Sequence, residues 1–221
     1  MPKVSEQYVE DKKNYIMDCA EELMKEIPLY RITMRDIIKK AGCSQGLIYR
    51  YYNGVDEIYA DLMNRETRQI DVKHRAEDIL QDDASDEEKI HRLFDLIGTY
   101  ILEVQEKIGG KFYYEIQVIY AFDEKKQREL LPTLTIKQNL MYLQSEIVRF
   151  VTEETEKGFF APQIPIDTLV NYAGASVDGI GNYAAMLHRD GIGADWEKMR
   201  LLFQMLGDYV IRCLRPKKRG E

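Results

Sequence analysis

The sequence is poor in the residues on which catalysis, metal binding and disulfide bonding most often depend. Its 221 residues include only three cysteines and three histidines: Cys19, Cys43, Cys213, His74, His91 and His188. The cysteines are odd in number and far apart, without the paired spacing of a zinc site or of a secreted disulfide framework. Neither a GxSxG nucleophile turn nor a phosphate-binding glycine loop occurs. We therefore expect no enzymatic activity, no metal and no cofactor.

Long apolar runs are missing as well. No stretch approaches the roughly 18 uninterrupted apolar residues of a membrane span. Residues 1–13 lack the apolar centre of a signal peptide, and the cysteine usage fits a reducing compartment. We expect a cytoplasmic protein that is neither exported nor bound to a membrane.

Strand signals are nearly absent, which predicts an all-α fold. Hydrophobic residues make up 45% of the chain, enough for a buried core at this length. Pro132 is tolerable only near the start of a helix or at a kink, and Gly109-Gly110 and Gly158 supply helix stops. Beyond the first 53 residues we expect helices at about residues 54–80, 86–108, 111–122, 125–157, 167–188 and 194–214.

Residues 31–58 have the pattern of two short helices joined by a tight turn and followed at once by a third. Thr33, with Asp36 three residues later, forms a variant of the capping box and predicts a helix start. Gly42 favours a left-handed stop, and Ser44 can cap the next helix. This arrangement is a helix-turn-helix, whose second helix lies in a DNA groove.

The second helix of this motif divides its side chains between a core and a partner. Leu47 and Ile48 can turn inward. The positions that remain available to a partner are Gln45, Gly46, Tyr49, Arg50 and Tyr51.

The net charge of −7 is unfavourable for DNA binding, but the bases gather in this motif. Local charge, rather than the total, meets the phosphates. The alternative is that Lys39 and Lys40 only solvate a helix face. Residues 31–52 carry a net charge of +4, from Arg31, Arg35, Lys39, Lys40 and Arg50 against Asp36.

The same residues resemble the DNA-binding domain of the TetR family of transcriptional regulators. The matching pattern is ITMxDI at residues 32–37, AGCSxGxIYxYY at 41–52 and DEI at 56–58. Matches of this density are specific, unlike a lone short pattern. The chain departs from the family at Val55, where a lysine that contacts phosphate is usual, and at Tyr52, where phenylalanine is usual.

This resemblance implies a helix-turn-helix DNA-binding domain at residues 1–53, a helical ligand-binding and dimerisation domain at 54–214, and a basic tail at 215–221. It implies a repressor that a small-molecule effector releases from a palindromic double-stranded DNA operator. The alternative is a helical dimeric interaction module that has lost or weakened DNA binding, supported by Val55 and the acidic total.

Specific contacts can be assigned within the DNA-binding domain. Gln45 and Tyr49 are expected to face the groove, and Gly46 marks the point where the backbone nears DNA. Phosphate contacts position the protein, whereas base contacts specify the sequence. The expected phosphate contacts are Thr33, Lys40, Ser44, Arg50 and Tyr51.

The resemblance also implies an effector pocket among the middle helices, which are rich in aromatic and polar residues. Such residues suit a ligand site, and they suit an ordinary core equally well. Glu115 and Glu146 favour a cationic or flat aromatic ligand. The expected pocket residues are Phe94, Phe112, Tyr113, Gln117, Tyr120, Asn139, Tyr142 and Tyr172.

The last two expected helices combine small residues, which permit close helix approach, with a wide apolar stripe. The resemblance implies that this pair forms a four-helix bundle with its twofold mate, giving a homodimer. Two reading heads about 34 to 36 Å apart would match a palindromic site. The alternative is that both helices only pack inside one subunit.

Overall fold

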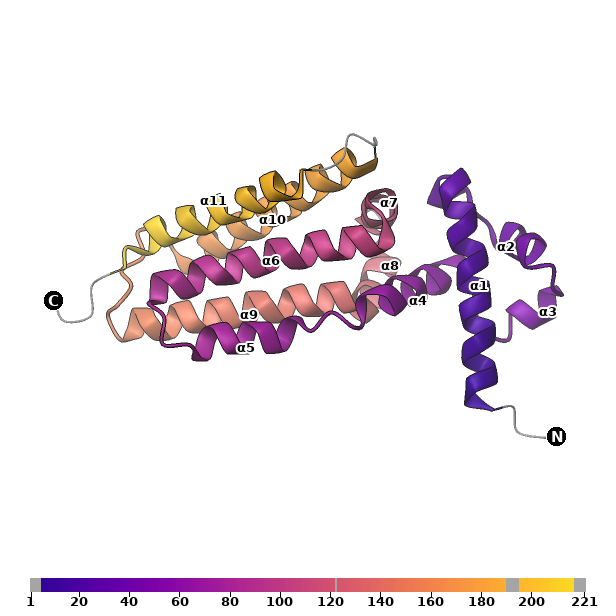
Figure 1. Cartoon of the computed structure of the whole chain (residues 1–221), viewed down its shortest axis with the longest axis horizontal. Helices are drawn as coiled ribbons and strands as arrows, with labels where there is room; N and C mark the ends of the chain where they lie inside the picture. Colours follow the sequence, from indigo (N-terminus) through magenta and orange to yellow (C-terminus); the bar gives the residue numbers. More distant parts are fainter. Residues whose placement is uncertain (1–4, 122, 190–194, 217–221) are drawn as a thin grey trace. The chain divides into compact units, whose positions relative to one another are not determined.

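The computed structural model describes residues 5–121, 123–189 and 195–216, and its regular elements are helices (Figure 1). The expected all-α fold class is confirmed. The elements are α1 (Glu6–Glu26), η1 (Leu29–Arg31), α2 (Met34–Ala41), α3 (Gln45–Ile48), α4 (Val55–Thr67), α5 (Val72–Gln81), α6 (Asp86–Ile108), α7 (Gly110–Ala121), α8 (Glu124–Glu129), η2 (Leu131–Thr133), α9 (Thr135–Glu156), α10 (Ile166–Arg189) and α11 (Trp196–Leu214), where η denotes a 3₁₀ turn.

Two helices expected from the sequence are interrupted. The one expected at residues 54–80 is divided into α4 and α5, and Asp71 caps α5 by accepting a hydrogen bond from the His74 N–H at 3.1 Å. The one expected at residues 125–157 becomes α8, η2 and α9, because Pro132 has no N–H with which to continue a helix. Both expectations of a continuous helix are wrong.

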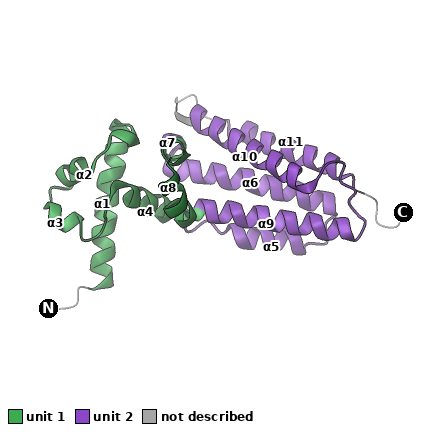
Figure 2. Cartoon of the chain, turned by 180° about the vertical axis from the view of Figure 1, so that it is seen from behind, with its two compact units in different colours: residues 1–67, 112–135 green, residues 68–111, 136–221 purple. Residues whose placement is uncertain are grey.

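The chain divides into two compact units (Figure 2). The first comprises residues 1–67 and 112–135, and the second comprises residues 68–111 and 136–221. The chain therefore crosses between the units three times. The first unit extends past the domain boundary expected after residue 53, because α4 and residues 112–135 pack with the N-terminal helices.

The core of the second unit depends on a close approach between α6 and α11. A Cβ atom on Gly98 would lie 2.6 Å from Cδ2 of Phe203, so only glycine leaves room for that fully buried ring. On α11, a Cβ atom on Gly207 would lie 3.1 Å from Cβ of Phe94. Each helix thus presents a glycine to a phenylalanine of the other, and the interdigitated contact excludes larger residues.

A polar cluster fastens the same two helices. Arg200 Nε donates to Asp95 Oδ1 at 2.6 Å, and Gln204 Nε2 donates to the same oxygen at 2.8 Å. Partial burial would raise the pKa of Asp95, but the hydrogen bonds from Arg200 and Gln204 outweigh it and hold that pKa below the ordinary value. The α6–α11 contact therefore combines an apolar centre with charge-assisted hydrogen bonds at its edge.

Candidate functional site

A capping box starts α2, as the sequence predicts. The Asp36 N–H donates to Thr33 Oγ1 at 3.3 Å, and the Thr33 N–H donates to Asp36 Oδ2 at 2.9 Å. The Thr33 hydroxyl also donates to Asp36 Oδ2, at 2.6 Å. Hydrogen bonds from the Thr33 side chain and backbone hold the pKa of Asp36 below its ordinary value. In this structure the Thr33 hydroxyl is therefore engaged within the helix start.

The turn after α2 has the left-handed geometry expected of Gly42. Its φ and ψ are 61° and 25°, a conformation that strains residues with a Cβ atom. The Gly42 N–H donates to the Lys39 carbonyl at 3.3 Å and closes the helix end. This turn directs the chain into α3.

The second helix of the motif, α3, is short, with four residues in α-helical geometry. Ser44 has the extended backbone of a cap residue, but its side chain accepts no cap hydrogen bond. The expectation that its hydroxyl caps α3 is wrong: the Leu47 and Ile48 N–H groups bond to the Ser44 carbonyl, and the hydroxyl accepts from neither. Ser44 is exposed at the helix start.

The faces of α3 divide largely as the sequence predicts. Ile48 is fully buried and Leu47 is half-buried, whereas Tyr51 is half-buried rather than fully available to a partner. The buried Tyr52 ring anchors the end of the motif, with the Lys13 ammonium 5.0 Å from its centroid. The exposed positions are Ser44, Gln45, Gly46, Tyr49 and Arg50.

Lys40 is the one expected DNA contact that is tied to another helix. Its Nζ lies 2.7 Å from Oε2 of Glu22 on α1. The hydrogen bond to Glu22 raises the pKa of Lys40 and lowers that of Glu22. Lys40 would have to exchange this carboxylate for a phosphate.

Within the described residues, four other bases of the motif are exposed and outside any ion pair: Arg31, Arg35, Lys39 and Arg50.

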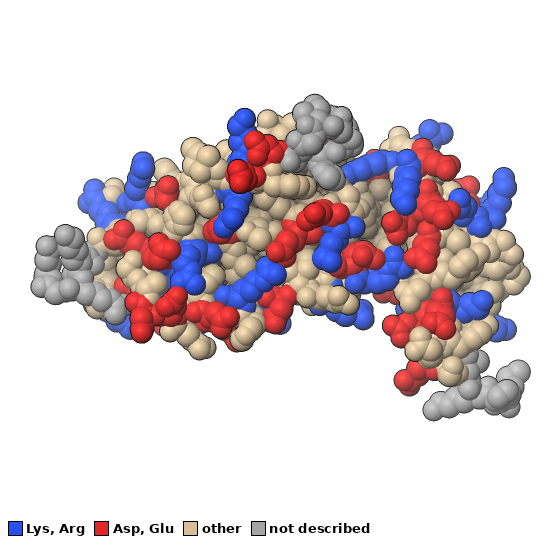
Figure 3. Space-filling view, viewed as in Figure 1, with Lys and Arg blue, Asp and Glu red and all other residues tan. Residues whose placement is uncertain are grey.

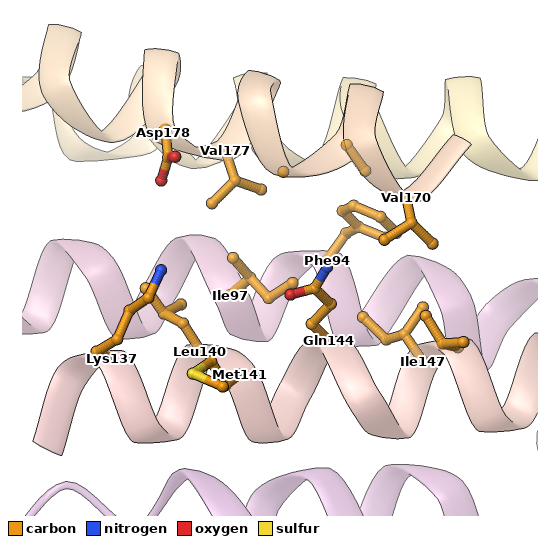
Figure 4. Close-up of a pocket in the computed structure, with 13 residues that line it drawn as sticks. Phe94, Ile97, Lys137, Leu140, Met141, Gln144, Ile147, Val170, Val177 and Asp178 are labelled. Carbon is orange, nitrogen blue, oxygen red and sulfur yellow. The ribbon is translucent and has the colours of Figure 1, made fainter. Parts of the chain in front are cut away.

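In the second unit, a hollow of about 190 Å³ opens between α6, α9 and α10 (Figure 4). Lys137 and Asp178 face one another at one end of it, and Gln144 extends its amide into the middle. The hollow thus has an apolar body and a polar end, as small-molecule sites usually do. Its apolar lining includes Phe94, Ile97, Leu140, Ile147, Val170 and Val177.

The expected pocket residues divide between the two units. Phe112, Tyr113, Gln117 and Tyr120 belong to the first unit, where all but the half-buried Gln117 are buried. The other four, Phe94, Asn139, Tyr142 and Tyr172, belong to the second. Their joint role in ligand binding stays a prediction.

The four residues of the second unit have different surroundings. Phe94 lines the hollow. The Asn139 amide donates to the Tyr100 hydroxyl at 3.0 Å, and the Tyr142 hydroxyl donates to Glu77 at 3.3 Å. Tyr172 is exposed.

The two carboxylates expected to attract a cationic ligand are both engaged. Oε2 of Glu115 accepts a hydrogen bond from the Leu29 N–H at 2.8 Å. Glu146 pairs with Arg149 at 2.5 Å. The expected preference for a cation therefore loses its structural basis at these two positions.

The exposed surface of α10 and α11 carries large apolar side chains. The Tyr172 and Tyr209 rings lie 5.1 Å apart on this surface, beside the small residues Ser176 and Gly179. Exposed apolar patches of this kind mark interaction sites. Its large members are Tyr172, Tyr183, Met186, Leu201, Met205 and Tyr209, which together are named the α10–α11 face.

Elsewhere, on the side of the molecule that Figure 3 shows, acidic and basic side chains are interspersed. Among the described residues, no cluster of histidine, cysteine and carboxylate side chains could hold a metal ion. None of the described helices is both long and apolar enough to cross a membrane.

Comparison with known families identifies the N-terminal region. Residues 16–62 match the model of the bacterial regulatory proteins of the tetR family. Two curated proteins of Mycobacterium tuberculosis, both described as uncharacterized HTH-type transcriptional regulators, are 36% identical over 55 residues. The match covers 25% of this chain and 27% of theirs, so it spans about a quarter of the length of these relatives.

Solved structures resemble the chain over nearly its whole length. The fatty acid degradation regulator FadR from Bacillus halodurans has a TM-score of 0.61 at 17% identity, covering 97% of this chain and 100% of its own. NalD, a secondary repressor of the MexAB-OprM multidrug efflux pump in Pseudomonas aeruginosa, has a TM-score of 0.60 at 15% identity, covering 93% and 98%. At such identities the likeness shows the fold alone.

The two cap residues should differ in their effect on stability. Thr33→Ala removes the side-chain acceptor of the Asp36 N–H and the hydroxyl that donates to the Asp36 carboxylate, and we expect it to lower the free energy of unfolding by about 1 kcal/mol. Ser44→Ala is the matched control, because its hydroxyl caps nothing, and its effect should be clearly smaller. Chemical denaturation followed by circular dichroism measures both. Equal losses for the two variants would contradict the assignment.

Proposed function

We propose that the chain, whose residues 16–62 match the model of the tetR family of bacterial regulatory proteins, is a TetR-family sequence-specific DNA-binding transcriptional regulator. The observation that carries the proposal is the exposed surface of the helix-turn-helix. There Gln45, Gly46, Tyr49 and Arg50 are exposed on α3 and the turn that follows it. The capping box of α2, the left-handed turn at Gly42 and the buried Ile48 hold this segment in place. That surface suits major-groove reading.

Within this surface we assign sequence reading to Gln45 and Tyr49. A glutamine amide can bond the N6 and N7 edge of adenine in two places. Arg50 is exposed and outside any ion pair in the described structure, which suits a phosphate contact. Thr33, Ser44, Tyr51 and Lys40 complete the proposed phosphate contacts, and Lys40 adds to affinity only when it leaves Glu22.

We further propose that the α10–α11 face is the interface of a homodimer. It combines large exposed apolar side chains with small residues that allow helices to approach closely. A twofold axis through such a face is isologous, since the same surface pairs with itself. The helix-turn-helix motifs of the two subunits, related by that axis, would bind the two halves of a palindromic operator.

The hollow between α6, α9 and α10 is our proposed effector site. A transcriptional regulator from Saccharomonospora viridis was solved in complex with choline, and it resembles this chain with a TM-score of 0.57 at 19% identity, covering 91% of this chain and 96% of its own. Here the lining favours a small, mainly aliphatic molecule with one polar end near Lys137, Gln144 and Asp178. Release of the operator on effector binding would make the protein a repressor.

DNA reading is tested first. Selection from a randomised duplex pool should enrich a palindrome that the native protein binds. Gln45→Ala should then relax the preference at one base of each half-site by about 1 to 3 kcal/mol. Arg50→Ala should weaken all sequences alike and lower the salt slope by about two, because each subunit of the dimer loses one phosphate contact. No enrichment by a folded dimer at low salt would overturn the proposal and favour an interaction module.

The dimer interface is tested with a pair of equally exposed methionines. Met205 on α11 and Met141 on α9 are both 57% exposed. Met205→Glu would bury two charges in the proposed interface, so we expect light scattering after gel filtration to show a monomer. Met141→Glu changes the lining of the proposed effector hollow but not the α10–α11 face, and it should remain dimeric in the absence of effector. A dimeric Met205→Glu protein would place the interface elsewhere.

The effector site is tested by filling it. Straight-chain carboxylates, amines and alcohols, screened by thermal melting, should include a compound that stabilises the native protein. Ala173→Phe places a ring in the hollow and should abolish that stabilisation, while the exposed Ser145→Phe should preserve it. Equal stabilisation of the native and Ala173→Phe proteins would move the site away from this hollow.

A further inference from the structure

Leu29, which opens the 3₁₀ turn ahead of the helix-turn-helix, has both of its backbone polar groups held by side chains of later helices. Its N–H donates to Oε2 of Glu115 on α7 at 2.8 Å. Its carbonyl accepts from the Tyr59 hydroxyl on α4 at 3.0 Å. The Leu29 side chain is buried as well. The backbone is therefore fixed four residues before Thr33 begins α2.

The carbonyl and the N–H of Leu29 differ in whether they keep another hydrogen-bond partner when the side-chain bond is lost. The carbonyl also accepts from the Ile32 N–H at 3.1 Å, so it keeps a partner without Tyr59. The N–H is the first donor of the turn and has no partner inside it. A buried donor without an acceptor is unfavourable, and an ionised acceptor makes a stronger bond than a neutral one. Of the two side chains that bond Leu29, Glu115 is therefore the one whose loss leaves a backbone group without a partner.

Several contacts tie α7 and α8 to the same unit as the helix-turn-helix. The Tyr59 and Phe112 rings meet edge to face, with centroids 6.1 Å apart and planes at 72°. Lys126 Nζ lies 3.0 Å from Oδ1 of Asp56. The Asn64 amide bonds both the end of η2 and the start of α9, donating to the Thr133 carbonyl at 2.9 Å and accepting from the Thr135 N–H at 2.7 Å.

We propose that Glu115 is a positioning residue for DNA recognition, which sets the path of the chain into the helix-turn-helix through the Leu29 N–H. The proposal rests on the proposed DNA-binding function. Through this bond α7, a helix distant in sequence from the motif, controls the path of the chain into α2. A displacement of α7 reaches Leu29 through one hydrogen bond, and so reaches the reading helix.

The test compares three variants of the full-length protein. Glu115→Ala removes the acceptor, Glu115→Gln keeps a neutral acceptor in its place, and Glu124→Ala removes an equal charge from an exposed site in the same unit. Two quantities are measured: affinity for the palindrome selected by the native protein, and amide hydrogen exchange at residues 29–32. Melting curves establish that each variant is folded.

We expect Glu115→Ala to bind the selected palindrome about tenfold more weakly, in the range for loss of a hydrogen bond to a charged group. The amide of Leu29 should exchange faster in that variant. Glu115→Gln should restore most of the affinity and protection, and Glu124→Ala should match the native protein. A merely structural loss would lower the melting temperature without rescue of exchange at Leu29 by glutamine.

Native-like affinity in a folded Glu115→Ala protein would overturn the inference and leave the proposed function intact. Unchanged exchange at Leu29 would overturn it as well, because the hydrogen bond would then not hold the turn. Failure of the native protein to select any duplex would overturn the proposed function, and this role of Glu115 with it.

Discussion

The geometry of the helix-turn-helix cannot come from its helices alone, because they are too short to be stable by themselves. Isolated helices below about 12 to 15 residues are marginal in water, and α2 and α3 have eight and four residues. Their geometry must therefore come from their ends and from burial. Thr33 with Asp36 fixes the start of α2, Gly42 fixes its end, and the fully buried Ile48 fixes the rotation of α3. The exposure of Gln45 and Tyr49 is a consequence of these three constraints.

These local constraints are also what the sequence predicts well. The Thr33–Asp36 cap and the Gly42 turn involve residues at most three apart, so their pattern is readable along the chain. A partner that is distant in sequence cannot be read in this way. The sequence suggests a ligand contact for Glu115 and gives no sign of its hydrogen bond to Leu29, 86 residues away. It suggests a phosphate contact for Lys40 and gives no sign of the ion pair with Glu22 on another helix. No periodicity reports such pairings.

The residues that line the candidate effector hollow could not be predicted from the sequence either. Tyrosines suit cores and ligand sites equally, because each needs one hydrogen-bond partner for a large ring. Tyr59 and Tyr100 both find such partners in the interior, at the Leu29 carbonyl and at Asn139. The hollow is lined mainly by aliphatic residues of three helices, and their meeting depends on helix packing. In that packing Gly98 admits Phe203, and Gly207 approaches Phe94 at the edge of the hollow.

A regulator requires that its effector and its DNA prefer different states of one molecule, since a ligand with equal affinity for both states shifts nothing. Phe94 bears on this requirement, because it lines the hollow and also packs against Gly207 of α11. A ligand that moves this ring must alter the contact between α6 and α11, and α11 contributes to the proposed dimer face. Because tightly packed interfaces do not deform continuously, a small displacement there favours a discrete change. By linkage, DNA binding would oppose the same change in the hollow with equal free energy.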